Sequence, residues 1–198
     1  MTPVIAFGEA LVDMLSSRLG DASGPETFTP YAGGAPANVA VACARLGVPS
    51  RFLGMVGADR FGRFLTAEMA SHGVDVSGVV TTFDARTALA FVSRDAHGER
   101  TFDFYRPPAA DLLYRLEHLP TGVFAEPAIV HLCSNSLTEE AIAETTLTLA
   151  DIAQQIAQAH GPSGPNSAYL LNLAQALREL GTEDAHIFAL EAQLQRYQ

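Results

Sequence analysis

Two glycines, a proline and an asparagine stand close together in the stretch Gly33-Gly34-Ala35-Pro36-Ala37-Asn38. A glycine pair lets the backbone approach another group closely, because no Cβ atom intervenes. The first turn of the helix that follows offers free N–H donors, and the Asn38 amide can both donate and accept hydrogen bonds. Neutral donors and acceptors of this kind suit a polyhydroxylated ligand such as a sugar. The alternative is purely structural, a tight turn in which Asn38 caps the helix.

Asp13 is a second candidate for binding hydroxyl groups. It stands in the apolar run LVDML, where a buried carboxylate is costly unless it has hydrogen-bond partners. Two neighbouring hydroxyls of a ligand would serve as partners, and so would backbone N–H groups. An exposed position at a strand end would remove the need for partners, and both interpretations stay open at this point.

The other residue types that could do chemistry form no recognisable cluster. The six histidines are dispersed without the helical spacing of metal ligands, so we expect no metal site. Cys43 and Cys133 are far apart and flanked by apolar residues, which predicts buried, reduced thiols. The stretch Ser134-Asn135-Ser136 follows an apolar run, and it either reaches a ligand or caps the next helix.

Strands and helices alternate along the part of the chain that must position these residues. Short apolar runs predict buried strands at residues 3–7, 51–57 and 128–133. Residues 37–46 predict a helix that is apolar on nearly all sides, and residues 59–73 predict an amphipathic one. Short alternating strands with a hairpin turn at Gly98 lie between these helices and the last strand. This order favours an α/β sheet with a strand-rich cover, and helices follow from about residue 137.

The composition of the 198-residue chain limits its possible partners. Hydrophobic residues make up 48% of it and charged residues 17%, enough apolar material for a sizeable core. The net charge of −10 disfavours nucleic acid and anionic membranes, because both need a basic surface. No apolar run is as long as a membrane span and the N-terminus lacks a secretory signal, so we expect a cytoplasmic protein. The net charge says nothing about small substrates, which respond only to the local field.

Five segments resemble, in order and spacing, the N-terminal half of the ribokinase-like (PfkB) carbohydrate kinases, nearest to the bacterial fructokinases. They are GEALVDM, AGGAPANVAVACARLG, GMVGADRFGR, TALAFVSRDAHGERTFDFYR and HLCSNSLT, within residues 3–145. The resemblance implies a sandwiched, mostly parallel sheet with a small β-lid, formed mainly by residues 11–32 and 79–106. It also implies phosphorylation of a fructose-type sugar hydroxyl, with ATP and Mg²⁺ as cofactors.

The same resemblance assigns the floor of the sugar site. Asp13 corresponds to the aspartate that holds sugar hydroxyls. Gly33, Gly34 and Asn38 correspond to the glycine pair and the asparagine beneath the sugar.

Further assignments fall in the lid. Tyr105 and Arg106 stand where the last lid strand meets the sugar in related ketose and keto-acid kinases. Phe91 is a looser match that we expect to face the sugar from above. The lid is also a candidate surface for pairing two copies of the chain into a homodimer.

Two motifs of the family are not found. These are the Asn-x-Arg segment and the Gly-Ala-Gly-Asp motif, which supply the ATP site and the general base. Gly57-Ala58-Asp59 is not that motif, because it precedes a different helix. We therefore assign no catalytic residue, recognise no ATP site and expect the chain to be inactive alone. The alternative is a non-catalytic remnant that binds sugar or forms dimers.

The C-terminal part resembles a different family. Residues 155–195 are similar to the tail of ChaC-type γ-glutamylcyclotransferases, most specifically in the stretch SGPN-x-x-YL. We therefore expect two unrelated fragments joined near residues 146–156, with a kinase-like half over 1–150 and a helical tail over 151–198. The tail is predicted to form a helical hairpin after residue 160, and a cyclotransferase-like function is a further alternative.

Overall fold

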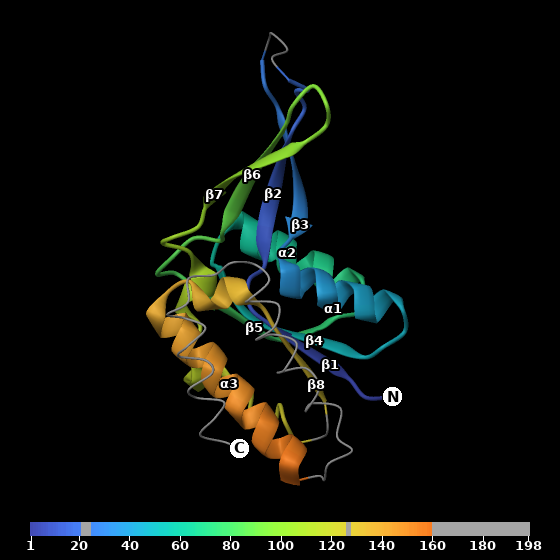
Figure 1. The fold of residues 1–198 in the computed structure, drawn as a ribbon, viewed down its shortest axis with the longest axis vertical. Helices are drawn as coiled ribbons and strands as arrows, with labels where there is room; N and C mark the ends of the chain where they lie inside the picture. Colours follow the sequence, from blue (N-terminus) through green and yellow to red (C-terminus); the bar gives the residue numbers. More distant parts are fainter. Residues whose placement is uncertain (21–24, 126–127, 160–198) are drawn as a thin grey trace.

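The computed structural model describes residues 1–20, 25–125 and 128–159, which form two sheets flanked by helices (Figure 1). The first sheet has the strand order β5-β4-β1-β8, and all neighbouring strands are parallel. Its strands are β1 (Val4–Phe7), β4 (Ser50–Gly57), β5 (Asp75–Thr82) and β8 (Ile129–Leu132). Short, nearly continuous apolar runs such as that of β1 are typical of a parallel sheet that is covered on both faces.

A second sheet projects away from the first and has the order β3-β2-β6-β7 (Figure 1). We call it the lid sheet; its strands are β2 (Leu11–Ser16), β3 (Phe28–Gly33), β6 (Leu89–Arg94) and β7 (Arg100–Tyr105). The central pair, β2 and β6, is parallel, and the two outer pairs are antiparallel. Residues 79–82, which we expected in the lid, belong to β5 of the first sheet, because β5 continues to pair with β4 until both strands end.

Helices cover both faces of the first sheet. In the described ranges they are α1 (Ala35–Arg45), α2 (Arg60–Ser71) and α3 (Glu140–Ala159), with short 3₁₀ turns η1 (Ala110–Leu113), η2 (Leu116–His118) and η3 (Ser134–Leu137). α1 and α2 share one core cluster with Ala6 and Phe52. α3 and η1 share a second cluster with Phe7 and Leu53, on the other face. This layered arrangement confirms the predicted fold class.

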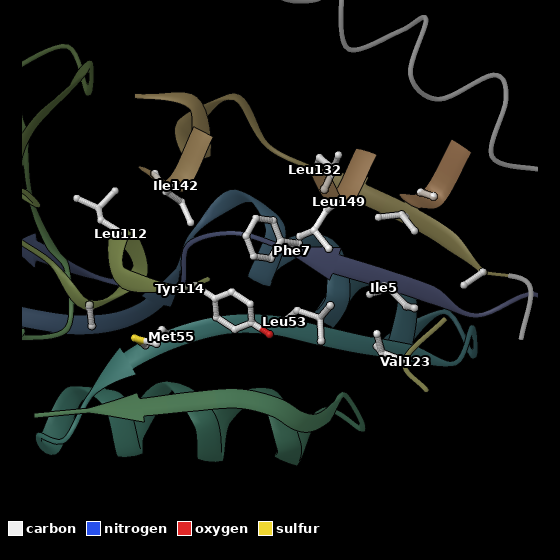
Figure 2. Packing of buried hydrophobic residues seen from close by; sticks show 14 residues of the cluster. Ile5, Phe7, Leu53, Met55, Leu112, Tyr114, Val123, Leu132, Ile142 and Leu149 are labelled. Carbon is white, nitrogen blue, oxygen red and sulfur yellow. The ribbon is translucent and has the colours of Figure 1, made fainter. Parts of the chain in front are cut away.

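Phe7 and Tyr114 stand at the centre of the cluster beneath α3 (Figure 2). Their rings meet edge to face with centroids 5.4 Å apart, and both side chains are almost fully buried. The Tyr114 hydroxyl donates to the carbonyl of His118 at 3.1 Å, and burial raises the pKa of Tyr114 to about 12. This packing fixes the end of β1, directly before Gly8 and Glu9, where the candidate site begins.

The structure corrects the expected burial and start of the first helix. α1 begins at Ala35, so Pro36 occupies its second position, and its buried residues are Pro36, Ala37 and Ala40. The remaining residues are exposed or half-buried, because within the described residues one side of α1 packs on the first sheet and the small side chains on the other sides meet no second layer. Gly34 precedes the helix with φ of 103°, a left-handed value that favours glycine.

The predicted junction near residues 146–156 falls inside α3, which runs without interruption from Glu140 to Ala159. The predicted hairpin after residue 160 lies outside the described residues. Among the helices that the structure describes, none is both long enough and apolar enough to cross a lipid bilayer.

Candidate sugar site

Asp13 and Gly33 lie side by side at the base of the lid sheet. Asp13 is in the middle of β2, opposite Tyr31 of β3 and Ala90 of β6, while Gly33 ends β3 directly before α1. A Cβ atom added to Gly33 would overlap the Asp13 carboxylate, with Oδ2 as its nearest neighbour. The carboxylate therefore occupies space that exists because residue 33 has no side chain.

The Asp13 carboxylate is half-buried, and we find no hydrogen-bond partner for it among the described residues. Across the described parts of the chain it accepts no hydrogen bond from protein. Burial raises its pKa above the usual 3.8, and the charge of Arg100 opposes part of this rise. The interpretation of Asp13 as an exposed strand-end residue is wrong. Hydrogen bonds donated by ligand hydroxyls would therefore stabilise this half-buried carboxylate.

Asn38 lies in the first turn of α1 with its side chain exposed. Its backbone N–H donates to the Gly34 carbonyl at 2.9 Å, so the residue is already inside the helix. Gly34 holds the N-cap position and no side chain caps the helix, so the interpretation of Asn38 as the cap is wrong. The amide is therefore available to a ligand above the start of α1.

Phe91 and Tyr105 lie on the face of the lid sheet opposite to that of Asp13. Asp13 pairs with Ala90, and side chains alternate between the two faces of a strand, so Phe91 points to the other side. The Phe91 ring meets Phe28 and Tyr105 edge to face, with centroids 4.9 and 5.1 Å apart. The structure does not bring these aromatic residues together with Asp13, and their contact with the sugar stays a prediction.

Arg106 lies in a buried ion pair. Its Nε donates to Asp111 Oδ2 at 2.8 Å, and its Nη2 lies 2.7 Å from the same oxygen. The Nη2 group donates to the carbonyl of Asn135 at 3.0 Å. Burial raises the pKa of Asp111, although the charge of Arg106 opposes the rise. Arg106 is thus held beside the end of β8, and its contact with a sugar also stays a prediction.

Glu9 is the residue that the sequence interpretation missed. It is 1% exposed, and its Oε1 accepts hydrogen bonds from the backbone N–H of Ala35 at 3.2 Å and from Asn135 Nδ2 at 3.0 Å. The signal was present, because a carboxylate in the apolar run AFGEALV raises the same question as Asp13. What the sequence could not show is the partner, since Asn135 is 126 residues away.

The chain matches the family model described as "pfkB family carbohydrate kinase" over residues 1–187. It belongs to the pfkB family of carbohydrate kinases. The match runs across the junction that we expected near residues 146–156 and into the tail. The comparisons therefore give no support to a tail taken from γ-glutamylcyclotransferases.

Curated relatives of this pfkB chain include plant fructokinases. It is 41% identical over 175 residues to Fructokinase-1 of Oryza sativa subsp. japonica, covering 88% of this chain and 52% of that protein. It is 43% identical over 162 residues to the Probable fructokinase-7 of Arabidopsis thaliana, covering 81% of this chain and 46% of the relative. The chain spans about half the length of the curated relatives that it matches.

Similar solved structures include two bacterial fructokinases. The fructokinase from Xylella fastidiosa matches at 53% identity with a TM-score of 0.73, over 78% of this chain and 48% of that one. The fructokinase from Vibrio cholerae O395 in its fructose-, ADP- and calcium-bound form matches at 34% identity with a TM-score of 0.69, over 79% of this chain and 48% of that one. These matches agree with the parallel sheet and lid sheet of the pfkB chain.

Membership of the pfkB kinase family implies ATP and Mg²⁺ as cofactors, and we recognise a site for neither among the described residues. No group of three or more His, Cys, Asp or Glu side chains gathers to hold a metal ion in the described ranges. Asp59, the acidic residue of the glycine turn before α2, caps that helix by accepting from the N–H groups of Phe61 and Gly62 at 3.0 and 2.9 Å. It also accepts from the Thr87 N–H and hydroxyl, both at 2.9 Å.

This clamp gives Asp59 a structural role. Burial alone would raise the pKa of Asp59, but the hydrogen bonds from Thr87, Gly62 and Phe61 together hold it below 3.8. A carboxylate with this low basicity and this many donors is a poor general base. It ties the start of α2 to the segment that leads into β6 of the lid sheet. We derive no step through ATP or Mg²⁺ from the described residues.

Proposed function

We propose that this chain binds the sugar in an ATP-dependent kinase reaction on a fructose-type ketose, and that it does not transfer the phosphoryl group by itself. The observation that carries the proposal is the half-buried Asp13 carboxylate, which lies against Gly33 and accepts no hydrogen bond within the described residues. Membership of the pfkB family and the similarity to fructokinases support a sugar as the ligand.

The expected binding chemistry follows from the donors and acceptors on the floor. Two neighbouring hydroxyls of the ketose would donate to the two oxygens of Asp13, as charge-assisted hydrogen bonds. A third hydroxyl would exchange hydrogen bonds with the Asn38 amide, which both donates and accepts. Gly33 leaves room for the Asp13 carboxylate, and Gly34 lets the turn pack against Glu9, so that Asp13 and the start of α1 can face the same sugar.

Phosphoryl transfer needs parts that we do not find in this chain. In the family, anion-binding backbone N–H groups and an aspartate general base come from a Gly-Ala-Gly-Asp segment, which the sequence does not contain. We therefore propose that the chain binds sugar and pairs with other copies of itself, and that it catalyses no phosphoryl transfer alone. We propose the cytoplasm as its location, because the ATP of such a reaction is available there.

Replacing Asn38 with leucine tests the proposed floor. Asn38→Leu is expected to abolish the rise in melting temperature that fructose causes, and to leave the protein without sugar folded. The reason is that the Asn38 side chain is exposed and caps nothing. Differential scanning fluorimetry with and without fructose measures both effects.

The matched control is Ala42→Leu, which adds the same side chain to another exposed position of α1. It should keep the response to fructose. A loss of about 1 kcal/mol in stability for Asn38→Leu with an unchanged fructose response would contradict the proposal and return the residue to a purely structural role.

We also propose that two copies pair through the lid sheet. Phe102 and Phe104 of β7 are 44% and 59% exposed, and their rings stack with centroids 5.9 Å apart. They lie on β7, an edge strand of the lid sheet, and exposed apolar side chains that lie together mark an interface. Light scattering should give the mass of a dimer for the purified chain and of a monomer for a Phe102→Ser, Phe104→Ser variant. A monomeric parent chain at about 50 μM, a concentration that saturates a micromolar dimer, would contradict this pairing.

A further inference from the structure

We propose that Glu9 is a positioning residue that holds the start of α1 and the end of β8 in the geometry that the sugar floor needs. The inference rests on the proposed function, because it assigns Glu9 a role in the same site. Glu9 follows β1 by two residues, and its side chain joins three segments that are remote in sequence: the β1–β2 connection, the start of α1 and the turn after β8.

Three donors converge on one oxygen of Glu9. Oε1 accepts from the Ala35 N–H at 3.2 Å, from Asn135 Nδ2 at 3.0 Å and, more weakly, from the Cys133 thiol at 3.8 Å. Burial raises the pKa of Cys133 to about 11, with a further rise from the charge of Glu9, so the thiol keeps its proton and remains a donor. One acceptor atom therefore sets the distance between Ala35 and Asn135.

The backbone of Glu9 constrains the same turn. A Cβ atom added to Gly34 would lie 2.5 Å from the Glu9 carbonyl oxygen and 3.0 Å from the Ala10 Cα atom. The turn before α1 is thus packed against Glu9 while its first N–H is bonded to the Glu9 side chain. Asn38 lies one turn further along this helix, so any shift of the helix start would move its amide.

Glu9 also orients the amide of Asn135. The Nδ2 group of Asn135 is committed to Glu9, which leaves its Oδ1 as the acceptor that a ligand hydroxyl can reach from the exposed side of the residue. The Asn135 carbonyl in turn accepts from Arg106 and from the Thr138 hydroxyl. The network therefore links the sugar floor to the buried Arg106–Asp111 ion pair.

Filling the space at this position would not require a polar side chain. Glu9 is 1% exposed, and its Oε2 has no partner among the described residues, which is a costly arrangement for a charged group. An apolar side chain would avoid this cost but would leave the Ala35 N–H and the Asn135 amide without an acceptor. The position of Oε1, rather than the filling of space, is what the site needs.

The test compares Glu9→Ala, Glu9→Gln and Glu9→Asp in the full chain by two measurements. Isothermal calorimetry gives the dissociation constant for fructose, and amide hydrogen exchange followed by NMR gives the protection of Ala35. Glu9→Ala should weaken fructose binding about tenfold or more and increase the exchange of Ala35 by a similar factor, because the oxygen that accepts from Ala35 and Asn135 is lost. Glu9→Asp should change both in the same direction, since its oxygen is withdrawn by one methylene. Glu9→Gln keeps an oxygen acceptor and should stay within about threefold of the parent chain.

Ser50→Ala is the matched control. It removes a buried hydrogen bond from Ser50 Oγ to the Ala40 carbonyl of the same helix, at 2.8 Å and away from the floor. It should lower the melting temperature without changing the fructose dissociation constant or the exchange of Ala35.

Two results would overturn the inference. One is unchanged fructose binding and unchanged Ala35 exchange in Glu9→Ala, or in Glu9→Asp if the alanine variant does not fold. The other is a loss in Glu9→Gln as large as in Glu9→Ala, which would mean that charge rather than the position of the acceptor matters. If the parent chain binds no fructose, the proposed function fails, and the exchange of Ala35 alone decides whether Glu9 positions the turn.

Discussion

The purified chain is expected to bind fructose weakly and to leave ATP intact. Binding is expected because Asp13, Gly33 and Asn38 are in place, whereas transfer needs a general base and an anion-binding loop that the sequence does not contain. Loss of both features together should reduce the rate by several powers of ten. Calorimetry measures the binding, and a coupled assay for ADP measures the turnover.

The control for this experiment is Asp13→Ala prepared in the same way, because it reports any contaminating kinase. ADP production that depends on fructose, exceeds this background and scales with the amount of chain would disprove the prediction. It would also mean that residues outside the described ranges supply the catalytic parts.

Removing the Asp13 carboxylate is expected to have the largest effect on sugar binding. Asp13→Ala should weaken fructose binding by at least about 100-fold, since two charge-assisted hydrogen bonds contribute roughly 1.5–3 kcal/mol each. Gly33→Ala should approach the same loss with Asp13 intact, because the new methyl group would overlap the carboxylate and force it aside. Titration calorimetry at neutral pH compares the two variants with the parent chain.

The same carboxylate predicts a dependence on pH. An ionised Asp13 accepts hydrogen bonds from hydroxyls, and protonation removes one acceptor. Because burial raises its pKa above 3.8, binding should weaken as the pH falls through that raised pKa, where an exposed aspartate would still be ionised.

Gly98→Ala provides the control for the glycine variant. Gly98 has φ of 86° in the β6–β7 turn, and a Cβ atom there would meet no other atom within 4 Å. This substitution strains the backbone far from the floor, so it should lower stability and leave fructose binding unchanged. Equal sugar binding in Gly33→Ala and the parent chain would contradict the proposed place of Asp13.

Much of the fold was predictable because local patterns encode it. The apolar run of β1 and the alternation of strands and helices indicated a covered parallel sheet. The amphipathic pattern of residues 59–73 and Gly98 indicated a helix and a hairpin turn, which depend on neighbouring residues. The burial of α1 was predicted wrongly, because an alanine-rich helix looks apolar on every side whether or not a second layer covers it.

In the candidate site, too, local patterns were predictable from the sequence and long-range contacts were not. The sequence by itself indicated that Asp13 and the turn from Gly33 to Asn38 suit hydroxyl groups, because a glycine pair permits close approach and a carboxylate in an apolar run needs donors. It left a structural turn and an exposed strand end open as alternatives. Only the tertiary structure decided that Gly33 makes room for Asp13, that Phe91 lies on the opposite face, and that Glu9 meets Asn135. A shift of one residue in strand register moves every side chain of that strand to the other face, and no local pattern fixes the register between strands that are distant in sequence. Contacts across 126 residues arise when the sheets assemble, so the residues that position the site become visible only in the folded chain.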